Sequence, residues 1–504
     1  MTRSGVFIAT VICACASPGV HARLELGGTR ADKNVPLLIT HATVIAIDSG
    51  ALLSLRTVVV RDGLISHVGQ TPNLEIPAGA QVVDARGQYL IPGLWDLHVH
   101  TSDPEPMSRL YVAHGVLGVR DLGADDEACA SPASGSFRKI KQWRETADRG
   151  EGLGPHFVSA RKILDAPPAV MPFVRLVSNA GEAAQAVLED KQAGADFIKV
   201  YASFTDADTY LAICSEAHKH GLKVAADPPY LLSMDTLLQG NLWSLEHLGQ
   251  GLFLRFASTK QSEIEARIGK LLVRTPADSF KDVVRVLHDA ATSFDDQKVR
   301  SFARRLREAH VAQVPTYVVM RLLLGVQEAQ ERFRNEYLPL ARRYSGACFA
   351  RTAESWMQPY MSYPPELLKL GERTDAAFVR LVQIMREEGV GILPGTDGGG
   401  SLFGASLHEE LAYFVEKFGF SSLEALQSAT IRAADFLGRQ ETSGSIAEGK
   451  RADLVLLADN PLEDIRNTKK ISGVIVHGRY LDPYQLQHLL EEAEQITADG
   501  LRSP

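Results

Sequence analysis

Two histidines stand two positions apart at the end of an apolar run. On a β-strand alternate side chains point the same way, so His98 and His100 share a face with Asp96. Two imidazoles that converge at a strand end can bind a metal ion, and a bound metal ion lowers the pKa of its water toward neutrality. The pattern alone is weak evidence, because a second such pair, His218 and His220, is expected at a solvent-exposed helix end.

Lys199 lies within another apolar run, and Phe197 and Tyr201 share its face if the run is a strand. A lysine is almost never buried without compensation of its charge. It either reaches the strand end, pairs with an acid, or is carboxylated by CO2 to an anion that can bridge two cations. Tyr201 is placed to hydrogen-bond a developing oxyanion, or is a buried aromatic residue with a satisfied hydroxyl.

His247 and Asp397 end two further apolar runs. Taken singly, such a histidine is often a core residue, and an aspartate before the glycines at 398–400 is often a turn former. Their joint occurrence with the histidine pair and the lysine, each on its own successive strand, favours a common site. His408 follows the glycines and is expected either to line the pocket or to lie behind it or on the surface.

Apolar runs and amphipathic helices alternate through the middle of the chain, which predicts an α/β fold with a parallel sheet. The units over residues 92–440 match the size of a (β/α)8 barrel, a TIM-like fold that places its chemistry at the carboxyl ends of the strands. Two long helical stretches, 251–310 and 320–388, are expected to cap that face. The strands are expected to end near His100, Asp121, Ala160, Tyr201, Asp227, His247, Val318 and Asp397.

The two ends of the chain have a different pattern. Residues 36–91 and 441–482 contain short strand-like runs separated by turns such as Asp62-Gly63, which predicts a small β-domain split between both ends. Residues 483–504 are expected to form a C-terminal helix and a tail.

Residues 1–22 have the pattern of a secretory signal peptide. Arg3 precedes an apolar stretch that is too short to span a membrane comfortably, and the small residue Ala22 precedes the expected cleavage site. We therefore expect a periplasmic or secreted protein that begins at Arg23. The alternative is a buried N-terminal strand or helix.

The mature chain keeps Cys129, Cys214 and Cys348, which are well separated and allow at most one disulfide. The 504 residues are 45% hydrophobic and 23% charged, with a net charge of −8 and no long basic run. This composition predicts a globular core and argues against nucleic acid or an acidic membrane surface as the main partner.

The run Pro92–His100 resembles the first-strand signature of the metal-dependent amidohydrolase superfamily. Further motifs are similar to its imidazolonepropionase- and prolidase-like branch, at residues 118–121, 194–201, 244–247, 395–397 and 449–455. The resemblance extends from about residue 36 to residue 482. It implies a barrel, a small β-sandwich built from both chain ends, and a two-metal hydrolytic site.

The resemblance also implies roles for individual residues. His98, His100 and Asp397 would hold one divalent ion, and carboxylated Lys199 would bridge to a second ion held partly by His247. Zinc is the expected metal, with manganese as the alternative, and Asp397 would act as general acid and base.

Asp227 departs from the pattern of this branch, whose fifth strand normally ends in a histidine ligand. An aspartate can bind zinc or manganese through oxygen, so Asp227 is expected as a ligand of the second ion. The alternatives are a one-metal site or a damaged site.

The leading hypothesis is an exported metal-dependent hydrolase that cleaves an amide bond in a dipeptide or an N-acyl amino acid, with no nucleic-acid partner and with homo-oligomers as a possibility. The alternatives are hydrolysis of a lactone or cyclic amide at the same site, and a non-catalytic barrel impaired by Asp227. The sequence contains no zincin helix, serine-hydrolase elbow, Walker loop or dinucleotide-binding fingerprint.

Overall fold

The computed structural model describes most of the chain beyond the first 34 residues. The described residues are 35–71, 76–123, 136–149, 152–167, 174–201, 205–227, 230, 232–248, 253–272, 276–346, 363–398 and 402–502. The expected signal peptide, Cys129 and Cys348 lie outside them, whereas Cys214 is a buried free thiol. Among the described residues, no helix combines the length and the apolar character needed to cross a membrane.

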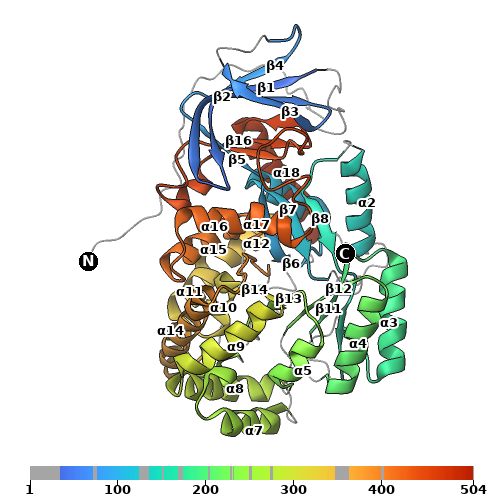
Figure 1. Ribbon diagram of the computed structural model, residues 1–504, viewed down its shortest axis with the longest axis vertical. Coiled ribbons are helices and arrows are strands. Elements are labelled where there is room, and N and C mark those ends of the chain that lie inside the picture. The colour runs from blue at the N-terminus through green and yellow to red at the C-terminus, as the bar shows by residue number, and fades with distance from the viewer. Residues whose placement is uncertain are drawn as a thin grey trace, which may run out of the picture.

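Strands from both ends of the chain form one mixed sheet of eight strands, at the top of Figure 1. The strands are β1 (Leu37–Ala46), β2 (Ala51–Arg61), β3 (Leu64–Gln70), β4 (Gln81–Asp84), β5 (Tyr89–Pro92), β15 (Leu454–Leu457), β16 (Ile471–Val476) and β17 (Arg479–Leu481). Their order is β17-β16-β15-β5-β1-β2-β3, and β4 pairs with β1. The antiparallel pairing of β5 with β15 joins the two ends.

Local sequence explains the two tight hairpins of this sheet. Asp62 and Gly63 have φ values of 51° and 77° between β2 and β3, and His477 and Gly478 have values of 51° and 78° between β16 and β17. Two successive positive φ values are the geometry of a type I′ turn, which matches the twist of antiparallel strands.

Two sets of parallel strands make up the middle of the molecule. One set is β6 (Leu94–Val99), β7 (Val116–Asp121) and β8 (His156–Ser159). The other set, in spatial order, is β10 (Arg175–Leu176), β9 (Ile163–Asp165), β11 (Phe197–Val200), β12 (Lys223–Ala226), β13 (Ser244–Glu246) and β14 (Ala312–Val314).

Backbone hydrogen bonds connect the two sets at both ends. The Asp196 N–H donates to the Ser159 carbonyl, which links the start of β11 to β8. At the other side Gln313 of β14 donates to Gly391, and Asp397 donates to His98 of β6. Residues 391–397 therefore lie between β14 and β6.

Two expected strand ends differ in the structure. The prediction of a strand end near Val318 is wrong, because β14 ends at Val314 and Val318 lies in a helix. Pro315 cannot donate a ladder hydrogen bond, and Thr316 turns the chain with a φ of 47°. The last expected strand, ending at Asp397, contains only one β-bridge, between Gln313 and Ile392.

Helices follow most of the parallel strands and surround them (Figure 1). In the first half they are α1 (Pro104–Ala113), α2 (Ser136–Asp148), α3 (Ala180–Ala193), α4 (Ala207–Lys219), α5 (Met234–Gln239), α6 (Leu254–Ala257), α7 (Gln261–Leu272), α8 (Pro276–Thr292) and α9 (Asp296–Glu308). In the second half they are α10 (Tyr317–Leu323), α11 (Gln327–Arg332), the π-helical turn η2 (Phe333–Tyr337), α12 (Leu338–Tyr344), α14 (Pro365–Glu387), α15 (Ala405–Glu416), α16 (Ser422–Ser428), α17 (Ile431–Phe436), the 3-10 helix η4 (Ile465–Lys469) and α18 (Pro483–Arg502). The helical character expected for 251–310, 320–388 and the C-terminus is confirmed among the described residues, and His218 and His220 lie at the end of α4 as expected.

The core divides according to strand faces. Leu454 and Leu456 of β15 pack in a cluster within the sheet of the chain ends, whereas Val455 and Leu457 pack in the main core. One face of the parallel strands forms a separate apolar cluster that includes Trp95, Leu97, Phe197, Ala225, Val314 and Leu393. Residues from successive strands thus share one interior beneath the strand ends.

A polar network ties β8 to the sheet of the chain ends. His156 Nε2 donates to Asp453 Oδ2 at 2.8 Å, while its Nδ1 accepts from Arg451 Nη1 at 2.6 Å. The His477 N–H donates to Asp453 Oδ1 at 2.8 Å, and His477 Nε2 donates to the Gly154 carbonyl. Both nitrogens of His156 are occupied, so this cluster joins two parts of the fold and leaves His156 no lone pair for a metal ion.

We predict that Asp453→Asn lowers the free energy of unfolding by about 2–4 kcal/mol at pH 7. Burial alone raises the pKa of Asp453, but the neighbouring His156 and the hydrogen bonds from His156 and His477 outweigh burial and hold that pKa well below its usual value. The carboxylate therefore stabilises the fold above about pH 4, and its contribution is lost as the pH falls toward the lowered pKa of the folded state.

Urea unfolding of both proteins across this pH range tests the prediction. Glu448→Gln is the control, because the His67–Glu448 pair has the same 2.8 Å separation but both side chains are about half exposed. A loss as small for Asp453→Asn as for the control would contradict the structural role of the network.

Candidate metal centre

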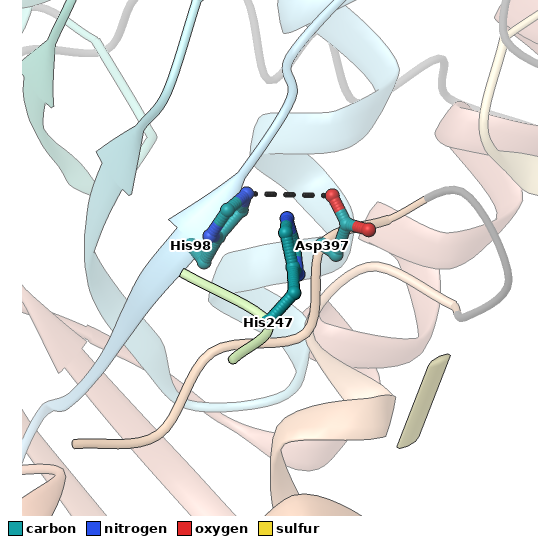
Figure 2. Close-up of side chains that lie close together, drawn as sticks. All are labelled: His98, His247 and Asp397. Carbon is teal, nitrogen blue, oxygen red and sulfur yellow. Dashed lines mark ion pairs between the residues drawn. The ribbon is translucent and has the colours of Figure 1, made fainter. Parts of the chain in front are cut away.

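Ligand groups from three parts of the chain converge at the carboxyl ends of the parallel strands. His98 Nε2 lies 3.3 Å from His100 Nε2 and 3.4 Å from Asp397 Oδ1, and His100 Nε2 lies 3.3 Å from the same oxygen. His247 joins them, since one ligand atom each of His98, His247 and Asp397 lie within 4.8 Å of one another. Figure 2 shows these three side chains pointing toward a common point.

The backbone is strained where it presents the ligands. His247 directly follows β13 with a φ of 56°, and Asp397 has a φ of 64°. Such left-handed conformations are uncommon outside glycine and concentrate at functional sites. Gly395 allows the approach of the Asp397 segment to β6, because a Cβ there would lie 2.6 Å from the Cβ of His98.

Acceptor-only partners fix the proton positions on the first two imidazoles. His100 Nδ1 contacts the Gly123 carbonyl at 2.9 Å, and His98 Nδ1 contacts Glu246 Oε2 at 2.7 Å. Each Nδ1 must therefore donate, which leaves the Nε2 of each neutral ring with a lone pair.

The third imidazole is held in the same way. Thr316 Oγ1 donates its hydrogen to the Pro315 carbonyl, so it accepts from His247 Nδ1 at 2.6 Å. Burial lowers the pKa of His247 to about 4, so the ring is neutral at pH 7 and its Nε2 carries a lone pair.

These atoms fit a divalent metal ion. The Nε2 atoms of His98 and His100 are 3.3 Å apart, so either a proton or a metal ion must lie between them. Burial lowers the pKa of His100, but the hydrogen bond to Asp397 and the charge of Asp397 outweigh burial and raise that pKa. Tetrahedral coordination with bonds of about 2.0–2.1 Å separates ligand atoms by about 3.3–3.4 Å, which is the spacing of His98, His100 and Asp397. The donor set of imidazoles and one carboxylate suits zinc, and also manganese.

Glu246 supports His98 from behind. Its Oε1 accepts from Arg120 Nη2 at 2.8 Å and from Ser244 Oγ at 2.5 Å, and all of these side chains are buried. Burial alone raises the pKa of Glu246, but the charge of Arg120 and the hydrogen bond from His98 hold it well below its usual value. Asp121, which follows Arg120 in the chain, accepts from the Thr101 N–H.

Lys199 and Asp227 lie beside this group. Lys199 Nζ is 2.5 Å from Asp227 Oδ1, which is itself 3.7 Å from His247 Nε2. Both residues are buried. Every metal ligand that the sequence predicts thus lies in one region of the described structure.

The two predicted substrate-binding residues differ in position. Tyr201 follows Lys199 by two residues and is 9% exposed. Its role as a hydrogen-bond donor to the substrate stays a prediction. His408 is fully buried in α15, with Nδ1 3.0 Å from Thr468 Oγ1 and Nε2 3.0 Å from the His114 carbonyl. Both of its nitrogens are occupied, which differs from the substrate-binding role that the sequence predicts for it.

Three supporting residues were not identified from the sequence. Glu246 and Thr316 orient imidazoles, and Asp96 accepts from the Thr396 N–H and hydroxyl, which anchors the Asp397 segment. The alternation of Ser244 and Glu246 on one strand face is the signal that could have revealed Glu246. No local pattern marks Thr316, which reaches His247 only through the pairing of β13 with β14.

One family model and several known proteins match parts of the chain. The model of the amidohydrolase family matches residues 325–481. A dihydroorotase from Anaeromyxobacter dehalogenans (strain 2CP-C) is 37% identical over 84 residues, which make up 17% of this chain and 19% of that protein. The chain thus matches less than a fifth of the length of this curated relative.

Solved structures match nearly the whole chain. A Xaa-Pro dipeptidase with bound methionine in its active site is 19% identical, with a TM-score of 0.61 over 89% of this chain and 100% of that one. The bottromycin amidohydrolase is 22% identical, with a TM-score of 0.67 over 91% of this chain and 90% of that one. At these identities the likeness shows a shared fold.

We predict that Glu246→Gln weakens zinc binding about 10- to 100-fold. A glutamine cannot accept from both Arg120 and His98, so its amide N–H2 faces one of them and favours the wrong tautomer of His98. The variant also leaves Arg120 without a charged partner and unfolds at lower temperature.

Competition with a chromophoric chelator measures the zinc affinity. Glu492→Gln is the matched control, because Arg109–Glu492 is an Arg–Glu pair of the same 2.8 Å length that joins helices α1 and α18. Wild-type zinc affinity in folded Glu246→Gln would show that Glu246 does not position His98.

Proposed function

We propose that the chain is a metal-dependent amidohydrolase and that it hydrolyses an amide bond at the site of His98, His100 and Asp397. The convergence of imidazole lone pairs with a buried carboxylate carries this proposal. The substrate class that we propose is a dipeptide or an N-acyl amino acid, and the amide hydrolases among the similar structures support it.

The proposed architecture is a (β/α)8 barrel with a β-sandwich domain built from both chain ends. The linked order β6, β7, β8, β11, β12, β13, β14 and residues 391–397, which return to β6, supports a closed ring. The site then lies at the carboxyl ends of the strands, where barrels of this kind carry their chemistry.

Asp397 is the proposed general acid and base. Burial raises its pKa, but the imidazoles of His247, His100 and His98 outweigh burial and hold the pKa well below its usual value, so Asp397 is a carboxylate. It accepts the proton of the attacking water and then delivers it to the leaving nitrogen. A bound divalent ion would acidify that water and polarise the scissile carbonyl.

Other residues position the reactants. His98, His100 and His247 would hold the ion through Nε2, and Glu246, the Gly123 carbonyl and Thr316 keep their rings in place. Tyr201 is the proposed donor to the developing oxyanion. The apolar cluster beneath the strand ends excludes water from below.

We further propose that the protein is exported. The signal-peptide pattern of residues 1–22 supports this location, in the periplasm or outside the cell.

We predict that Asp397→Asn lowers kcat by about 10²- to 10⁴-fold or more, because the amide cannot accept the proton of the attacking water. Activity is screened on Xaa-Pro dipeptides, N-acyl amino acids, cyclic amides and lactones, with zinc or manganese supplied. Removal of the metal by a chelator abolishes the wild-type activity, and its return restores it.

Asp190→Asn is the control, because Asp190 is also buried but lies in α3, where it pairs with Arg161. It should keep the wild-type rate if it folds. A metal-loaded wild-type protein that hydrolyses no compound of the panel would favour the non-catalytic alternative.

Export makes a separate prediction. Expressed in a secreting bacterium, the full chain yields a periplasmic or secreted protein whose mass corresponds to a first residue of Arg23. Ala22→Trp should block processing, because the cleavage site needs a small residue. A chain that starts at Arg23 should stay in the cytoplasm, and recovery of unprocessed full chain there from wild type would contradict the proposal.

A further inference from the structure

Lys199 and Asp227 lie on neighbouring parallel strands in a register that brings them together. Lys199 pairs with Ala225 across β11 and β12, and Asp227 lies two residues further on the same face. The Asp227 N–H donates to the Val200 carbonyl, which holds the residue beside β11. The Lys199 Nζ to Asp227 Oδ1 distance is 2.5 Å, with side chains only 1% and 6% exposed.

Without a second cation, a carboxylated Lys199 does not fit this environment. Carboxylation requires the ammonium group to lose one proton, after which a bond forms between Nζ and the carbon of CO2, a second proton is released, and the side chain becomes an anion. That anion would lie against the Asp227 carboxylate in a buried space, where two like charges repel strongly. An ammonium group in the same position gives each charge a partner, as buried charges require.

A single ion also accounts for the other ligands. His247 shares its ligand cluster with His98 and Asp397, so it can reach the same ion as they do. Its nearest acid beyond that cluster is Asp227 at 3.7 Å, which already accepts from Lys199.

We propose that Lys199 stays an unmodified ammonium, that its ion pair with Asp227 occupies the position of a second metal ion, and that the chain binds one ion, at His98, His100, His247 and Asp397. The inference rests on the proposed metal-dependent function but not on the identity of the substrate. Asp227 thus serves as the counterion of Lys199, at the position where the related branch normally has a histidine metal ligand.

The second carboxylate oxygen of Asp227 would have a different partner in a one-ion site and in a two-ion site. Asp227 Oδ2 is buried and has no hydrogen-bond partner among the described residues. With one ion it is an acceptor for a water molecule or a substrate N–H, whereas with two ions it would be a metal ligand. The two arrangements therefore differ in metal content and in the chemical state of Lys199.

The test combines elemental analysis of protein loaded with zinc or manganese with carbon-13 NMR of the zinc-loaded protein equilibrated in labelled bicarbonate, because paramagnetic manganese would broaden a carbamate signal. We expect one ion per chain and no carbamate signal from the wild type. Two ions with a carbamate signal would overturn the inference and leave the proposed function intact. The absence of any bound ion would overturn the proposed function, and the inference with it.

Asp227→His tests the cause. This substitution removes the counterion and supplies an imidazole, so we expect a second ion and a carbamate signal. Asp459→His is the matched control, because Lys470–Asp459 is also separated by 2.5 Å but is exposed, and it should leave one ion and no carbamate.

Lys199→Gln keeps the inference testable if Asp227→His does not fold. Its amide can still donate to Asp227, and circular dichroism confirms folding. We expect one ion per chain in Lys199→Gln, as in the wild type. A folded Lys199→Gln protein that binds no ion would show that Lys199 itself holds the metal, which contradicts the inference.

Discussion

The arrangement of the site depends on three hydrogen bonds that fix imidazole protons. A backbone carbonyl, a carboxylate and a hydroxyl that already donates elsewhere each accept from an Nδ1. Because no partner can donate back, Nε2 carries the lone pair in the neutral form of each ring, and the three rings converge with Asp397 at one candidate metal site. In the absence of a cation this convergence costs free energy, so the fold is organised for an ion before the ion arrives. The backbone at His247 and Asp397 is strained, and the contacts around both residues keep it in that conformation.

The contacts that hold the ligand side chains in place come from several strands. Glu246 connects His98 to Arg120, whose guanidinium also donates to the Leu97 carbonyl and lies against the Trp243 ring. A buried arginine and carboxylate would be costly singly, but together with the histidine they form a satisfied network. Asp96 anchors the segment that carries Asp397, and burial raises the pKa of Asp96 to about 7 despite these hydrogen bonds. The rigidity of the ligands is thus distributed over groups that never touch the ion.

The sequence predicts the ligands better than their supports, and the reason is physical. His98 and His100 follow from the two-residue period of a strand, and the alternation of strands and helices predicts which chain segments meet. Glu246 and Thr316 act through register between strands that are far apart in sequence, which no local pattern encodes. The strand end expected near Val318 failed because Pro315 and Thr316 stop the ladder earlier. His408 looked available because a sequence does not show that Thr468 and the His114 carbonyl occupy both of its nitrogens.

The exchange of a histidine for Asp227 is best understood through charge. A buried ammonium alone would repel a nearby divalent ion, and a carboxylate alone would compete for it as a ligand. Together, Lys199 and Asp227 form a pair with no net charge, so their combined field at the ion is that of a dipole and falls off steeply with distance. A carbamate beside Asp227 would instead place two negative charges in the same space, and only a second cation could stabilise them. Carboxylation of Lys199 and binding of a second ion are therefore coupled in this chain, and neither is favourable without the other.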